Sequence, residues 1–341
     1  MRGTTFALAT MAATVALIGA AEARDQIRIV GSSTVFPFST AVAEQFGQTS
    51  GFPTPVVEST GSGGGLKLFC AGVGEQHPDI TNASRRIKAS EVETCATNGV
   101  KEITEVKIGY DGIVFAHSKA SEPLAITIPQ LWLALAKEVP VDGEITANPY
   151  KMWSDIDPGL PAEKIEVLGP PPTSGTRDAF VELVMDKGCE GFPEVEALGN
   201  EDQMKAVCQT MREDGGFVEA GENDNLIVQK LEANPAAFGI FGFSFLDQNI
   251  DKLQGSLIDG VEPTFEAIAD GDYPVSRSLF FYVKNAHVGV IPGIEDYVEE
   301  FTGEAAMGED GYLADKGLIP LPEDELEAVR AAAVSFTPLS M

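Results

Sequence analysis

Residues 169–180 read Gly-Pro-Pro-Pro-Thr-Ser-Gly-Thr-Arg-Asp-Ala-Phe and join a strand pattern to a helix pattern. The mainly apolar residues 165–168 predict the strand, and Phe180, Leu183 and Val184 recur at the spacing of one helix face. The prolines keep the approach extended, because their ring fixes φ and the residue before a proline avoids helical angles. The segment therefore predicts a junction where a strand ends and a helix begins.

The first turn of this helix carries groups that suit an anion. Ser174, Gly175 and Thr176 fall where the helix begins, with hydroxyl groups beside backbone N–H groups that have no helical partner. The free N–H groups and the helix dipole both favour negative charge there. Arg177 adds a planar guanidinium that suits a tetrahedral oxyanion. An ordinary helix cap uses the same residue types, so the anion interpretation depends on repetition of the pattern elsewhere.

Two other segments repeat the pattern. A strand pattern at residues 27–30 is followed by Gly-Ser-Ser-Thr-Val at 31–35, and a strand pattern from Val56 is followed by Thr-Gly-Ser-Gly-Gly-Gly at 60–65. A flexible linker is the alternative for the glycine-rich segment, which lacks the spacing of a Walker loop. The candidate anion-binding residues of the three junctions are Ser33, Thr34, Val35, Ser62, Gly63, Ser174, Gly175, Thr176 and Arg177.

Strands alternate with helices along the chain, which predicts α/β architecture. In open α/β sheets, ligands bind beyond the carboxyl ends of the strands, where all three junctions would lie. Three helix termini that converge on one small anion could complete its hydrogen bonds. Three unrelated helix caps remain the alternative.

The first 23 residues predict a secretory signal peptide. Arg2 supplies the positive charge, residues 6–20 form an apolar core, and Ala-Glu-Ala at 21–23 fits a cleavage site. A membrane anchor is the alternative, but the apolar run is short for a span and no second span follows. We therefore expect an exported, periplasmic protein that starts near Arg24 and is long enough for two domains.

The cysteine content fits an oxidising compartment. Four cysteines in an exported chain suggest two disulfides, for which three connectivities are possible. Proximity in the sequence favours Cys70–Cys95 and Cys189–Cys208. The chain has no Cys-x-x-Cys motif and its three histidines are scattered, so neither a metal site nor a cofactor is expected.

The chain is strongly acidic, with a formal net charge of −29. This charge argues against nucleic acids and anionic membranes as partners. An anionic ligand is still compatible with it. The Debye length is about 8 Å at physiological salt, so distant surface carboxylates have little effect inside a cleft.

Six stretches together resemble a known family over essentially the whole mature chain. They are Gly-Ser-Ser-Thr-Val-Phe-Pro at 31–37, Gly-Ser-Gly-Gly-Gly at 61–65, Asn-Ala-Ser-Arg at 82–85, Thr-Ser-Gly-Thr-Arg at 173–177, Phe-Gly-Ile-Phe-Gly-Phe at 238–243 and Tyr-Pro-Val-Ser-Arg at 273–277. The family is that of the phosphate-binding proteins that deliver phosphate to Pst-type ABC importers.

The resemblance implies a two-lobed periplasmic-binding-protein fold, similar to type II, with two mixed sheets flanked by helices. Two crossing strands, near residues 113–115 and 279–283, would join the lobes. Lobe I would hold residues 24–113 and 280–341, and lobe II residues 114–279. The implied function is binding of inorganic phosphate by a monomer and delivery to permease subunits, without catalysis.

Two other functions stay open at this point. One is the binding of another oxyanion, such as sulfate, molybdate or a phosphonate. The other is a secreted phosphatase, although the chain has no Gly-x-Ser-x-Gly motif and no cluster of metal-ligating residues.

Two positions differ from the pattern of familiar members. Pro170 stands where they have an arginine, and Arg177 is the expected replacement. Arg85, a secondary candidate ligand, stands where they have an aspartate that accepts the proton of bound phosphate and thereby excludes sulfate. Asp111 is the candidate for that role because it precedes an expected crossing strand, although a turn aspartate is the alternative.

Overall fold

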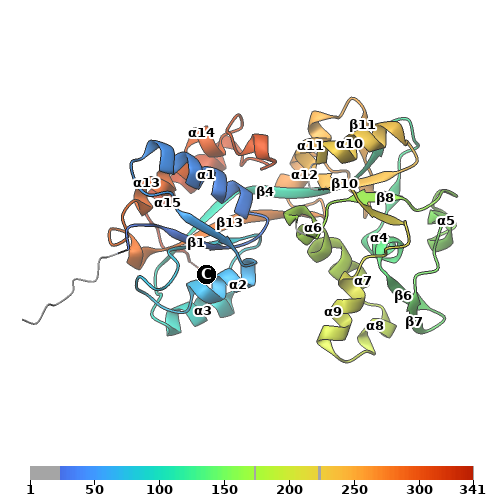
Figure 1. The fold of residues 1–341 in the computed structure, drawn as a ribbon, viewed down its shortest axis with the longest axis horizontal. Helices are drawn as coiled ribbons and strands as arrows, with labels where there is room; N and C mark the ends of the chain where they lie inside the picture. The colour runs from blue at the N-terminus through green and yellow to red at the C-terminus, as the bar shows by residue number, and fades with distance from the viewer. Residues whose placement is uncertain (1–23, 173, 222–223, 341) are drawn as a thin grey trace, which may run out of the picture.

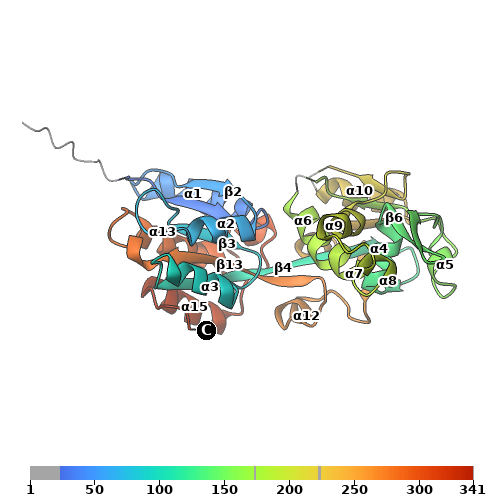
Figure 2. The same cartoon turned by 90° about the horizontal axis from the view of Figure 1, so that it is seen from below.

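The computed structural model describes residues 24–172, 174–221 and 224–340. The predicted signal peptide, residues 1–23, lies outside the described residues. Figures 1 and 2 show two lobes connected by two long strands, β4 (Ile103–Ser118) and β13 (Ser276–Lys284). The predicted α/β architecture and two-lobed fold are confirmed.

Lobe I is built on the sheet order β2-β1-β3-β13-β4. Strand β1 is parallel to both neighbours, and β13 is antiparallel to β3 and β4. The other strands of this lobe are β1 (Arg28–Gly31), β2 (Val56–Ser59) and β3 (Ile80–Ala83). Its helices are α1 (Phe36–Thr49), α2 (Ser62–Phe69), α3 (Ala89–Thr97), α13 (Ile294–Phe301), α14 (Glu304–Met307) and α15 (Glu323–Val334), with the short 3-10 turns η2 (Asn285–His287) and η3 (Ala314–Lys316).

Helices cover both faces of this sheet (Figure 1). Successive side chains of a strand point to opposite faces. Phe280 and Tyr282 accordingly pack in the cluster beneath α2 and α3, whereas Phe281 belongs to the main core that includes α1 and α13. Because helices cover both faces, all four residues of β3 are buried, including the polar Thr81 and Asn82.

Lobe II continues the hydrogen-bonded ladder from β4 through β10, β8 and β9. The two mixed sheets therefore share β4. Its further strands are β5 (Ala125–Ile126), β6 (Glu138–Val141), β7 (Glu144–Ala147), β8 (Val167–Gly169), β9 (Phe217–Glu219), β10 (Phe238–Gly242), β11 (Leu253–Gly255) and β12 (Leu257–Ile258).

The helices of lobe II surround this part of the sheet (Figure 2). They are α4 (Ile128–Leu135), α5 (Trp153–Ile156), α6 (Gly175–Phe180), the π-helical segment η1 (Val181–Asp186), α7 (Lys187–Cys189), α8 (Pro193–Glu196), α9 (Glu201–Gln209), α10 (Asp224–Ala233), α11 (Phe243–Gln248) and α12 (Phe265–Ala269). The α6–η1–α7 segment runs without a break and borders lobe I at its α6 end.

The two disulfides connect the pairs that sequence proximity favoured. Cys70–Cys95 joins the end of α2 to α3, and Cys189–Cys208 joins α7 to α9. Each closes a short loop and constrains the unfolded chain, which stabilises the fold by about 3 kcal/mol on the chain-entropy estimate.

Within the described part of the chain, no helix combines the length and apolar character that crossing a bilayer requires.

Candidate functional site

The loop between β1 and α1 presents two hydroxyl groups toward lobe II. Gly31 ends β1 with φ of 131°, and a Cβ there would lie 2.1 Å from the carbonyl oxygen of Asn82. Only glycine fits this close approach of β1 to β3. The Ser32 hydroxyl accepts a hydrogen bond from Val35 N–H at 3.3 Å, which leaves Ser33 and Thr34 to face the other lobe.

The loop between β2 and α2 lies beside the first loop. A Cβ on Gly65 would lie 2.4 Å from the Gly31 Cα atom, so the first turn of α2 packs directly on the end of β1. Ser62, at the start of α2, accepts a hydrogen bond from the Ser84 N–H at 3.0 Å, and the two hydroxyl oxygens are also 3.0 Å apart. Junctions far apart in the sequence therefore meet at one edge of the lobe I sheet.

The third junction, between β8 and α6, approaches from lobe II. Ser174 caps α6, because its hydroxyl accepts a hydrogen bond from the Thr176 N–H at 3.2 Å. A Cβ on Gly175 would lie 2.9 Å from the Thr34 Cα atom, and the Thr34 hydroxyl lies 3.4 Å from the Gly175 carbonyl oxygen. The start of α6 thus contacts the β1–α1 loop across the boundary between the lobes.

Arg277 supplies the cation at this meeting point. Its Nη2 donates to the Thr34 hydroxyl at 2.7 Å, its Nη1 to Glu182 at 2.5 Å, and its Nε to Asp111 at 3.4 Å. Asp111 on β4 and Arg277 on β13 are direct cross-strand partners, which places their side chains on one face of the crossing strands. The Arg277 side chain is only 8% exposed, so its charge is held in a fixed place.

A cavity of about 220 Å³, here named the anion pocket, gathers these groups. Its lining comes from three loops of lobe I, from β13 and from the α6–η1 segment. The lining residues are Ser32, Ser33, Thr34, Gly61, Ser62, Gly63, Ser84, Arg85, Asp178, Glu182 and Arg277.

A second cavity, of about 430 Å³, adjoins the anion pocket through Ser33 and Thr34. It contains Asp111 and the three residues at the start of α6, Ser174, Gly175 and Thr176. Ser174, Gly175 and Thr176 therefore lie on one side of the Ser33–Thr34 loop, and the residues of the β2–α2 junction lie on the other.

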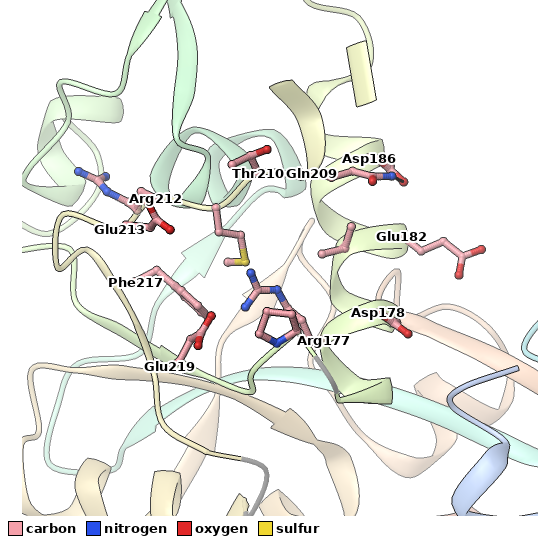
Figure 3. A pocket seen from close by; sticks show the side chains of 13 residues that line it. Arg177, Asp178, Glu182, Asp186, Gln209, Thr210, Arg212, Glu213, Phe217 and Glu219 are labelled. Carbon is pink, nitrogen blue, oxygen red and sulfur yellow. Dashed lines mark hydrogen bonds between the residues drawn. The ribbon is translucent and has the colours of Figure 1, made fainter. Parts of the chain in front are cut away.

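Arg177 and Val35 lie apart from this group. Figure 3 shows Arg177 pointing into a larger cavity of about 680 Å³, near Phe217 and Glu219, which shares Asp178 and Glu182 with the anion pocket. Its guanidinium stacks over the Phe217 ring at 4.7 Å and donates to the Pro170 carbonyl at 3.1 Å, and burial lowers its pKa. Val35 is fully buried, and its N–H donates to the Ser32 hydroxyl.

The remaining two candidates are held by strong partners. Arg85 lines the anion pocket, but its two Nη atoms bind both carboxylate oxygens of Glu91 at 2.9 and 2.8 Å, and this pairing raises the pKa of Arg85. Burial raises the pKa of Asp111, and the adjacent Arg277 guanidinium opposes that shift. Asp111 thus serves first as a partner of Arg277.

Two carboxylates in the anion pocket were not expected from the sequence. The Ser33 hydroxyl donates to Asp178 at 2.5 Å, and Glu182 pairs with Arg277. Asp178 and Glu182 are one helical turn apart and line both the anion pocket and the Arg177 cavity of Figure 3. Arg277 was not among the predicted site residues either, although it lies two residues before the apolar run expected to form a crossing strand, and that position was a usable signal.

The chain matches known proteins over most of its length. Residues 19–305 match the model of the PBP superfamily domain. A protein named phosphate-binding protein PstS from Staphylococcus saprophyticus is 30% identical over 304 residues, which cover 86% of this chain and 80% of that protein. The protein SphX from Synechococcus elongatus is 30% identical, covering 86% of this chain and 76% of that one.

Solved structures agree with these relatives. A possible phosphate binding protein from Planctomyces limnophilus aligns with a TM-score of 0.74 and 27% identity, over 92% of this chain and 99% of that one. PstS from Borrelia burgdorferi shares the fold, with a TM-score of 0.58, 19% identity and coverage of 88% and 100%. The chain therefore belongs to the PBP superfamily and, within it, to the family of the phosphate-binding proteins named PstS.

Proposed function

We propose that this chain binds inorganic phosphate between its two lobes and delivers it, in the periplasm, to the permease subunits of an ABC importer. The observation that carries the proposal is the anion pocket, where hydroxyl donors from separate loops meet the fixed charge of Arg277. A volume of about 220 Å³ suits a tetrahedral anion with a few waters, since one water takes about 30 Å³ in the liquid. The family of the chain supports the same ligand.

In this proposal the two lobes share the ligand. Ser33, Thr34, Ser62 and the Gly63 N–H bind it from lobe I, and the donors at the start of α6 bind it from lobe II. Those lobe II donors are Ser174, Gly175 and Thr176, which line the adjoining cavity and would reach the anion past the Ser33–Thr34 loop as the lobes close on it. Arg277 takes the role of the missing arginine, because Arg177 faces a different cavity.

A carboxylate should accept the proton of bound phosphate. Sulfate carries no such proton at neutral pH, so a carboxylate in contact with it would be an uncompensated repulsion. Asp111 remains a candidate, and Asp178 becomes a second one because it lies in the anion pocket beside Ser33. The amide variant of the residue that accepts the proton, and not that of the other, should lose the exclusion of sulfate.

Binding should favour the closed arrangement of the lobes. An anion held by both lobes binds that arrangement better and shifts the population toward it. We place the boundaries at residues 24–113 with 280–341 for lobe I and 114–279 for lobe II, since β4 and β13 run between the lobes there (Figure 1). The proposed cycle uses one chain, no cofactor and no chemical change in the anion.

Calorimetric titration of the mature protein with phosphate, sulfate and arsenate tests the proposal. We expect one phosphate per chain with micromolar affinity or better, which corresponds to about 8 kcal/mol or more. Absence of heat and of thermal stabilisation at millimolar phosphate would refute it. Preference for sulfate would indicate another oxyanion, and release of phosphate from a simple phosphate ester would indicate a hydrolase.

A further inference from the structure

The carboxylate of Glu182 forms an ion pair with Arg277, which lines the anion pocket. Its Oε2 atom lies 2.5 Å from Nη1 of Arg277, and the other two nitrogens of Arg277 contact Thr34 and Asp111. An oxyanion on Arg277 would need the N–H group that now points to Glu182, or would lie directly beside this carboxylate. Glu182 therefore holds the place of a ligand oxygen.

The pair is asymmetric in a way that makes Glu182 the mobile partner. The Arg277 side chain is 8% exposed, whereas the Glu182 side chain is 55% exposed. Arg277 is anchored by further contacts on two sides. The Glu182 carboxylate can rotate into solvent and keep its hydration, while the guanidinium stays in the pocket.

The second arginine of the pocket is also influenced by Glu182. The pKa of Arg85 is raised first by its hydrogen bond to Glu91, and Glu182 adds to that effect. Glu182 comes from η1 of lobe II, whereas Arg85 belongs to lobe I and Arg277 to a crossing strand. One lobe II carboxylate thus pairs with Arg277 and also acts electrostatically on Arg85, the other arginine that lines the anion pocket.

We propose that Glu182 is an internal competitor of the ligand, which must leave Arg277 when phosphate binds and returns when it departs. Two negative groups cannot share one guanidinium face without mutual repulsion, so each bound phosphate displaces an existing ion pair. The consequence is an affinity below the maximum that the pocket could reach and a faster release. This inference rests on the proposed phosphate binding.

The test compares phosphate binding by the wild-type protein, Glu182→Gln and Glu182→Ala. Both variants should bind phosphate about 1.5- to fivefold more tightly, the range expected for loss of a competing, partly exposed ion pair. The gain should appear mainly in a slower dissociation rate, measured by stopped-flow displacement. Glu190→Gln is the matched control, because it removes an equal charge from an exposed glutamate in lobe II outside the pocket.

The possible outcomes are distinct. Weaker or unchanged binding by both Glu182 variants, with the wild-type protein binding phosphate and circular dichroism showing intact folds, would overturn the competitor role alone. An equal gain in Glu190→Gln would assign the effect to general charge and overturn it as well. If the folded wild-type protein binds no phosphate, the proposed function itself fails, and this inference with it.

Discussion

Replacement of Arg277 by alanine tests the assignment of the binding cation most directly. The side chain has donors beyond those that hold Thr34, Asp111 and Glu182, and a guanidinium contacts a tetrahedral anion best through two parallel N–H groups. Each hydrogen bond to a charged group contributes about 1.5 kcal/mol at the low end. Loss of two should weaken phosphate binding by about 3 kcal/mol, or about a hundredfold.

Arg177→Ala provides the comparison, because Arg177 faces the larger cavity of Figure 3. It should lose mainly its stacking on Phe217, worth about 0.5–1 kcal/mol of stability, with little effect on affinity. Isothermal titration calorimetry on both variants decides between the two arginines. A hundredfold loss in Arg177→Ala with normal binding by Arg277→Ala would refute the assignment.

Arg277→Ala should also make stability depend on pH through Asp111. Burial already raises the pKa of Asp111 in the folded protein, and Arg277 is the group that opposes this shift. Without Arg277 the pKa rises further, so the ionised carboxylate destabilises the fold once the pH exceeds its unfolded pKa of about 3.9. The stability deficit of the variant should therefore be small in acid and grow as the pH rises through the folded pKa. Urea unfolding from about pH 4 to about pH 8 measures it, and a deficit independent of pH would contradict this explanation.

Three further predictions concern specificity, closure and the disulfides. Of Asp178→Asn and Asp111→Asn, the variant that lacks the acceptor of the phosphate proton should bind phosphate more weakly and sulfate more strongly than the wild-type protein. Unchanged rejection of sulfate by both variants would exclude both residues. Phosphate should reduce the radius of gyration in small-angle scattering, and identical profiles with and without ligand would count against closure. Reduction of the two disulfides should lower the free energy of unfolding by about 3 kcal/mol per bond, while the preference among anions stays the same. A changed preference would show that the disulfides help to hold the binding site in shape.

The loops of the site could be predicted from sequence because their signals are local. A strand pattern, a glycine and a run of hydroxyl residues mark the β1–α1 and β2–α2 junctions, and the structure brings both to one edge of the sheet. The need for glycine at positions 31 and 65 is visible only in the folded structure, because each lets the backbone approach a distant segment that a side chain would push away.

Which arginine lies in the anion pocket could not be predicted from such local signals. Neighbouring residues on a helix point about 100° apart, so the position of Arg177 in the motif does not say which side of α6 it occupies. Asp178, its neighbour, lines both cavities and accepts a hydrogen bond from Ser33, while Arg177 lines the larger cavity and not the anion pocket. Arg277 reaches the pocket through the register of β13 on β4, and that register depends on residues far apart in the sequence.

The pairing of Arg277 with Asp111 on the crossing strands has a consequence for the order of release. When two bodies rotate about a connection, atoms near the axis move least, and this ion pair lies on the strands that form the connection. We expect the start of α6 to withdraw farthest from a bound anion as the lobes separate, while Arg277 and the serines of lobe I change their positions little. The ion would then remain bound to lobe I after its contacts with lobe II are lost. A membrane partner would therefore receive the ion from lobe I alone.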